Sequence, residues 1–216
     1  MPLLIVVLGS VLSFALVIPF QYLIIWLSDF VDSATTYQPI LMGIVISTVM
    51  GMALTAPISS VAIAVSINLS GIAAGAACVG CCTQMVGFMI MSIRDNNVGK
   101  VISIGVGTSM LQFQNILKKP ILWLPTIIVS AVLGPISTAV MGLACNSVGA
   151  GMGTCALIGP IQMVVSTENP LMGWLGATLI CVVVPAILVF LIDLLFRKLN
   201  LIKPGDLAIL KESKRS

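Results

Sequence analysis

The sequence contains no histidine, and only 8% of its 216 residues are charged. The absence of histidine removes the most common general base and proton shuttle of enzymes. A soluble domain has about 25% charged residues, so this chain has too little polar surface to cover a water-soluble globule. The sequence also lacks a paired-carboxylate motif, a Ser/His/Asp set and a phosphate-binding loop. We therefore expect neither a soluble enzyme nor a catalytic residue of these kinds.

The residues that are present indicate an integral membrane protein. Hydrophobic residues make up 59% of the chain, and the mean hydropathy is +1.18. The net charge of +3 comes from basic residues in short connections and in the tail, a pattern typical of an inner-membrane protein and not of a nucleic-acid binder. We predict an all-α, multi-pass inner-membrane protein, with a membrane domain at 1–196 and a basic cytoplasmic tail at 197–216.

About 20 apolar residues suffice for a transmembrane helix, and five segments meet that length. They are 2–26, 40–67, 71–93, 120–145 and 171–196. Pro57 is predicted either to kink the second of these or to divide it into two half-helices, because proline removes a backbone donor and clashes with the preceding turn. Two further segments, 101–117 and 146–160, are rich in glycine and are predicted to be re-entrant or broken.

The glycine-rich segments are predicted to line a site. Irregular backbone at membrane depth is tolerated only where it is buried in protein or faces a watery cavity. We therefore assign a lining role to the backbone of five glycines: Gly105, Gly107, Gly149, Gly151 and Gly153.

The positions of the basic residues predict the orientation. By the positive-inside rule, 94–100, Lys118, Lys119 and the tail lie in the cytoplasm, and Glu168 lies outside. Segment 101–117 then enters from the cytoplasm and segment 146–160, which we call the glycine run, enters from outside, so that the two meet near the midplane. The orientation of the N-terminus stays open, since it depends on whether the chain spans or turns back at Pro57.

A weak internal repeat supports a transport function. At an offset of 78 residues, 56–59 matches 134–137 and Asn68 matches Asn146. Interrupted segments at corresponding places of two repeats point to a transporter binding site between them. Chance similarity in a chain of biased composition is the alternative.

Uncharged polar residues on the irregular backbone are the candidate substrate contacts. Their amides and hydroxyls both donate and accept hydrogen bonds, which suits a neutral polyhydroxylated solute such as a sugar or polyol. The alternative for each is a hydrogen bond between helices. The candidates are Asn68, Thr108, Gln112, Asn115, Asn146 and Thr154. The charged Asp193 lies four residues before Arg197, a spacing that predicts an ion pair on one helix face.

The six cysteines favour packing over metal or redox chemistry. Cys78 and Cys81 have CxxC spacing, but the chain has neither a second such pair nor a histidine. Cysteine is also a common small packing residue in apolar surroundings. We accordingly predict no metal site and no cofactor.

Several motifs, taken together and in order, resemble a bacterial family. They are 38–43, 56–60, 69–77, 107–112, Asn115 with Pro120, 134–137, 151–154 and 159–160. This family is the membrane subunit IIC, second type, of the phosphoenolpyruvate-dependent sugar phosphotransferase system, and the resemblance covers residues 38 to 165. The chain looks shorter than the usual member.

The resemblance implies a subunit that binds and translocates a sugar, forms homodimers and works with cytoplasmic IIA and IIB components. Any phosphotransferase activity would then need a phosphorylated IIB partner. The residues leave two alternatives open. One is a transporter or binding protein for another small solute or lipid without phosphoryl transfer, and the other is a fragment that pairs with a longer subunit.

Overall fold

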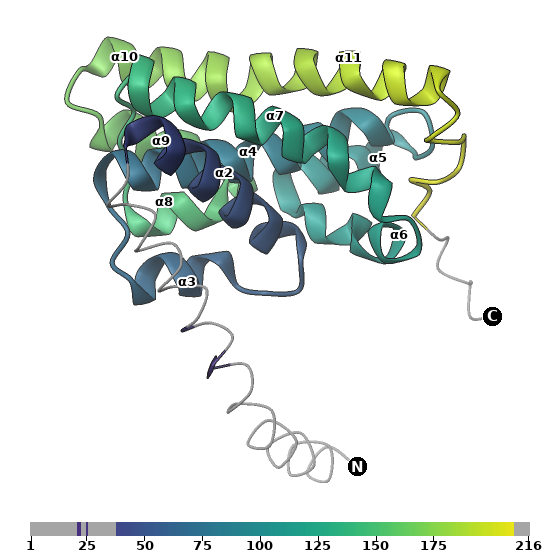
Figure 1. The fold of residues 1–216 in the computed structure, drawn as a ribbon, viewed down its shortest axis with the longest axis horizontal. Helices are drawn as coiled ribbons and strands as arrows, with labels where there is room; N and C mark the ends of the chain where they lie inside the picture. The colour runs from purple at the N-terminus through teal and green to yellow at the C-terminus, as the bar shows by residue number, and fades with distance from the viewer. Residues whose placement is uncertain (1–20, 23–24, 26–37, 210–216) are drawn as a thin grey trace, which may run out of the picture.

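A computed structural model describes residues 38–209 together with Gln21, Tyr22 and Ile25. These residues form a helical bundle without a β-strand, which confirms the predicted all-α membrane class (Figure 1). The predicted first span lies outside the described residues apart from those three. The elements are α2 (Pro39–Thr55), α3 (Ser60–Ser66), α4 (Gly71–Ser92), α5 (Val98–Ile102), η1 (Ser103–Gly107), η2 (Ser109–Gln112), α6 (Phe113–Lys118), η3 (Pro120–Trp123), α7 (Leu124–Pro135), η4 (Ile136–Val140), α8 (Ser147–Met152), η5 (Cys155–Leu157), α9 (Ile158–Ser166), α10 (Pro170–Leu175), η6 (Gly176–Val183) and α11 (Val184–Lys198).

Helix α4 is the centre of the bundle. Every residue from 73 to 88 is buried, and α2, α7, α8 and α11 all pack against it. Its sequence is rich in alanine, glycine and cysteine, whose small side chains let neighbouring backbones come close. A helix that is apolar all round is suited to such a fully buried position.

Glycines set the closest approaches between these helices. A Cβ atom on Gly80 of α4 would lie 1.9 Å from the backbone oxygen of Ser47 in α2. A Cβ atom on Gly134 of α7 would lie 2.1 Å from the backbone oxygen of Gly43, also in α2. The hydroxyl of Ser47 in turn donates a hydrogen bond to the backbone oxygen of Ser130, at 2.8 Å. Helix α2 is therefore held against both α4 and α7 at glycine contacts.

The predicted break at Pro57 is confirmed. Helix α2 ends at Thr55, and α3 begins at Ser60 after a tight turn in which the Ile58 N–H donates to the Ala56 oxygen at 2.7 Å. The Ser59 hydroxyl caps the new helix by accepting a hydrogen bond from the Ala62 N–H at 3.2 Å. Further along, Pro135 is followed by the π-helical turn η4, where the missing proline N–H interrupts the regular helix.

Three described helical stretches are long and apolar enough to cross a membrane, namely Gly71–Ser92, Pro120–Val140 and Pro170–Lys198. They coincide with the third, fourth and fifth predicted spans. In an apolar 18-residue window of Gly71–Ser92, 89% of the window is buried inside the protein, whereas in Pro170–Lys198 the buried share is only 28%. The outer stretch exposes Ile187, Leu191 and Leu195 among others, so this apolar face is suited to contact with lipid.

The basic connections and the tail gather at one end of the bundle, beside α5 and α6 (Figure 1). Arg197 forms the predicted ion pair with Asp193 at 2.8 Å and also approaches Asp95 at 3.7 Å. Lys100 donates to the backbone oxygen of Ile209 at 2.7 Å. The loop between α9 and α10, which contains Glu168, lies at the opposite end. This separation is the one that the positive-inside prediction requires.

The described part of the tail, which reaches residue 209, folds back onto this basic end. Leu207 is fully buried, and its backbone oxygen accepts hydrogen bonds from Asn96 Nδ2 at 2.7 Å and Gln112 Nε2 at 2.9 Å. Asp206 pairs with Lys119. Burial raises the pKa of Asp206, but the Lys119 ammonium and the Lys203 backbone N–H outweigh burial and hold that pKa below its ordinary value.

Replacement of Gly80 by alanine tests the glycine contact between α2 and α4. The new methyl group would collide with a backbone oxygen, so we expect Gly80→Ala to lower the free energy of unfolding by about 2–3 kcal/mol, in the range of overpacked cores. Gly99→Ala is the matched control, because nothing lies within 4 Å of a Cβ atom there. The measurement is the thermal midpoint in detergent. Equal midpoints for the two variants would contradict the contact.

The Asp206 pair predicts a pH dependence of tail docking. Because the pKa of Asp206 is lowered on docking, the pair stabilises the docked tail fully at pH values above the ordinary pKa of an aspartate, about 3.9. That stabilisation is lost as the pH falls through the lowered pKa. Asp206→Asn should weaken docking at neutral pH by up to about 1 kcal/mol, as for a partly exposed ion pair. Proteolysis of the tail should then be a few-fold faster, whereas the control Glu168→Gln should not change it.

Candidate functional site

The glycine run folds as a hairpin of two short helices. At its base, the Thr167 hydroxyl accepts a hydrogen bond from the Ala144 N–H at 3.2 Å. At its tip, the Gly159 N–H donates to the Gly153 oxygen at 2.9 Å. This helix–break–helix form agrees with the predicted re-entrant segment. Ala156 and Leu157 at the tip have φ values of 46° and 60°, a strained conformation for residues other than glycine that is typical of functional sites.

The segment that follows α4 is broken in a similar way. Helix α5 and the π-helical turn η1 run up to Thr108, whose backbone is extended, and η2 and α6 follow. The Thr108 hydroxyl caps η2 by accepting from the Met110 N–H at 3.2 Å. Both ends of this segment are fixed by the tail, through Lys100 and Lys119. It is therefore a second hairpin, which starts from the basic end of the bundle.

The two hairpins contact each other at their tips. The buried Thr154 hydroxyl donates to the backbone oxygen of Gly105 at 2.6 Å. The break between α2 and α3 joins them, because the Ser60 hydroxyl donates to the backbone oxygen of Gly151 at 2.7 Å. Three interrupted segments, which are far apart in the sequence, thus meet at one place.

A pocket of about 380 Å³ opens where they meet. Small-molecule sites have volumes of about 300–1,000 Å³, so this pocket can hold one small solute. Its lining carries hydroxyls and irregular backbone but no charged side chain. The lining residues are Leu54, Pro57, Ile58, Ser59, Ser60, Val61, Gly107, Thr108, Met110, Gly151, Met152 and Cys155.

A buried polar cluster lies next to this lining and centres on Gln84 of α4. Gln84 Oε1 accepts hydrogen bonds from Thr126 at 2.9 Å and from Trp123 Nε1 at 3.2 Å. Because the Trp123 indole N–H can only donate, the atom that it meets must be the amide oxygen. Gln84 Nε2 then has no acceptor among the described residues. Thr55 and Ser109, which adjoin lining residues, are hydrogen-bonded to each other at 3.0 Å, and Thr55 extends the cluster to Gln84 at 3.4 Å.

Three of the predicted site residues line the pocket: Thr108, Gly107 and Gly151. Two more, Thr154 and Gly105, form the contact between the hairpin tips. Ser59 and Gln84 were not among the predicted site residues. The proline two residues ahead of Ser59 was a usable signal, but Gln84 lies in a regular helix without any motif.

The other predicted residues have structural contacts outside the pocket. Asn146 caps α8 and also donates to Gln162 at 2.8 Å, and so joins the two helices of the hairpin. Gln112 and Asn115 donate to tail carbonyls. Asn68 is exposed, with a φ of 50°.

Two further predicted glycines serve close packing within the hairpin. A Cβ atom on Gly149 would lie 2.6 Å from the Cys145 sulfur, and one on Gly153 would lie 2.8 Å from the backbone of Cys81. Gly153 also has a positive φ of 56°, which favours glycine. A lining role for their backbone stays a prediction.

Comparison with known proteins identifies the family. No curated protein and no solved structure matches the chain. A family model described as "Phosphotransferase system, EIIC" matches residues 1–209, nearly the whole sequence. The match agrees with the helical membrane architecture and includes all three interrupted segments of the pocket. The chain therefore belongs to the EIIC family of membrane subunits of the phosphotransferase system.

Proposed function

We propose that the chain binds a sugar in the pocket between the three interrupted segments and moves it across the bacterial inner membrane. The observation that carries this proposal is the meeting of the α2–α3 break with the tips of both hairpins. Transporters commonly place their substrate at such discontinuous helices near the middle of the bilayer, between segments that enter from opposite sides. The two hairpins have their bases toward opposite ends of the bundle.

The chemistry of the lining favours a neutral hydroxylated solute. The hydroxyls of Ser59 and Thr108 can donate and accept, as the hydroxyls of a sugar do, and the Ser60 hydroxyl, which already donates to Gly151, can still accept. A charged solute would lose its hydration without meeting an opposite charge. We propose that Thr108 and the backbone of Gly107 and Gly151 contact the sugar. Thr154, Gly105 and Asn146 would instead keep the hairpins in place.

Phosphorylation is assigned to a partner. The lining has no carboxylate, lysine or arginine to act in phosphoryl transfer, and the chain has no histidine. The basic end of the bundle faces the cytoplasm in the predicted orientation. We propose that a phosphorylated IIB component approaches from this end and phosphorylates the sugar on arrival. A homodimer stays a prediction.

Uptake by variants in vesicles tests the pocket. Thr108→Val removes one hydroxyl, which is worth about 0.5–1.5 kcal/mol as a hydrogen bond, so the KM for the sugar should rise about 2- to 10-fold. Gly151→Leu should abolish uptake while leaving membrane insertion intact, because even a Cβ atom there would lie 2.5 Å from Val61 Cα. Thr178→Val, in the outer element η6, is the control and should transport normally.

The assay uses a panel of labelled sugars with the IIA and IIB components and phosphoenolpyruvate. Normal uptake by both Thr108→Val and Gly151→Leu would remove the pocket from the pathway. Accumulation of unmodified sugar without any phosphorylated partner would reject the coupling to phosphoryl transfer but not the pocket.

A further inference from the structure

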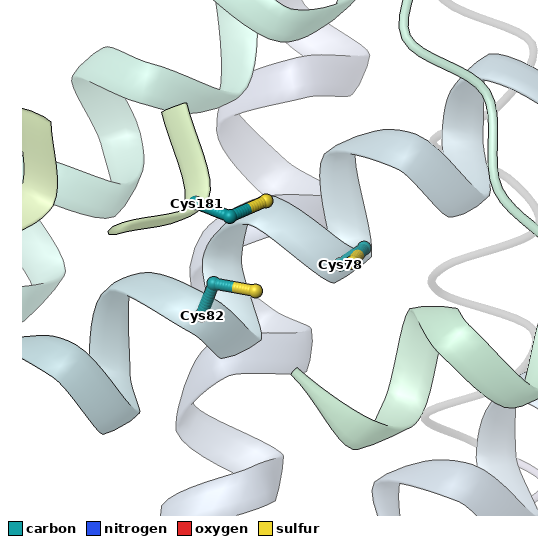
Figure 2. Close-up of side chains that lie close together, drawn as sticks. All are labelled: Cys78, Cys82 and Cys181. Carbon is teal, nitrogen blue, oxygen red and sulfur yellow. The ribbon is translucent and has the colours of Figure 1, made fainter. Parts of the chain in front are cut away.

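Three cysteine thiols converge in the core of the bundle, away from the pocket. Cys78 and Cys82 lie on successive turns of α4, and Cys181 comes from η6 (Figure 2). Their Sγ atoms all lie within 4.8 Å of one another, and all three residues are fully buried. The fold thus brings Cys181, which is distant in the sequence, to the thiols of Cys78 and Cys82. Cys81, the second cysteine of the CxxC spacing, is not part of this group.

The spacing of the sulfurs is close to that of a metal centre. The centre of a triangle with sides of 4.8 Å lies about 2.8 Å from each corner. Bonds between zinc and cysteine sulfur are about 2.3 Å long. For a metal ion in the plane of the three sulfurs, each sulfur would have to move inward by about 0.5 Å or less to reach bonding distance.

A fourth sulfur lies beside one of these three donors. The buried Met163 of α9 has its Sδ atom 3.8 Å from Cys181 Sγ. Neither a histidine nor a carboxylate belongs to this group. Sulfur donors without oxygen or nitrogen select soft ions and disfavour magnesium or calcium.

We propose that Cys78, Cys82 and Cys181, with Met163 as a fourth donor, bind one soft metal ion of the zinc and cadmium type. Each thiol that binds as a thiolate releases one proton. Two thiolates balance the charge of a divalent ion, and a third leaves a single negative charge on the site. The thioether adds no charge, which suits a site in an apolar core.

The ion would link three parts of the bundle. Helix α4 supplies two ligands, η6 one and α9 one, and α9 is the returning arm of the glycine-run hairpin. The hairpin lies against the same site, since a Cβ atom on Gly159 would be 2.8 Å from Cys78 Sγ. Binding is therefore expected to stabilise the packing of the hairpin on α4.

Cadmium binding to the full chain, purified in detergent without metal and under reducing conditions, tests the proposal. We expect one Cd²⁺ per chain by native mass spectrometry, together with a thiolate-to-cadmium charge-transfer band. Cys82→Ser and Cys181→Ser should weaken binding at least 10-fold. Cys81→Ser is the matched control: Cys81 is equally buried on the same helix, but its thiol donates to the Met50 oxygen at 3.4 Å, a bond that serine also makes.

A stability readout keeps the test independent of folding defects in one variant. Cadmium should raise the thermal midpoint of the unmodified chain and of Cys81→Ser. It should not raise the midpoint of the single variants Cys181→Ala and Cys82→Ala, nor that of the double variant that combines Met163→Leu with Cys181→Ala. The proposal is overturned if no charge-transfer band forms, or if the band and the midpoint shift persist undiminished in both the Cys82 and the Cys181 variants.

Discussion

The close packing of α4 is the constraint on which the rest of the structure depends. This helix is enclosed on all sides, and glycine at position 80 lets the α2 backbone approach it directly. Without a hydrophobic driving force between helices in lipid, such close contacts provide the stabilisation. Once α2, α7 and α11 are fixed around α4, the interrupted segments have rigid neighbours. The helices on either side of each break can then stay folded although the chain is interrupted there.

The irregular backbone at the pocket is stabilised by side chains from the opposing segments. Thr154 satisfies the Gly105 oxygen and Ser60 satisfies the Gly151 oxygen, which matters because an unpaired polar group inside a membrane costs several kcal/mol. The pocket beside these contacts is lined by three hydroxyl side chains among mostly apolar residues, and no charged side chain lines it. Uncharged hydroxyl side chains therefore stabilise the breaks and also make the site suitable for a neutral solute.

The sequence predicted the parts of the fold that have local causes. Pro57 and the glycine run specify breaks through their own backbone chemistry, so the positions of the broken segments were correct. Long-range contacts were not accessible in this way. The partners of Gln112 and Asn115 are tail carbonyls about 95 residues away, and Cys181 joins Cys78 only through the packing of η6 on α4. Gln84 was missed because its partners come from other elements.

The central claim is that the three interrupted segments form the sugar site, and a structure of the chain with a bound sugar tests it most directly. The account predicts density for the sugar in the pocket of about 380 Å³, in contact with Thr108, Ser59 and the backbone at Gly151. Sugar bound elsewhere, for example in the apolar groove that Ile161, Trp174 and Val182 line between α9 and η6, would contradict it.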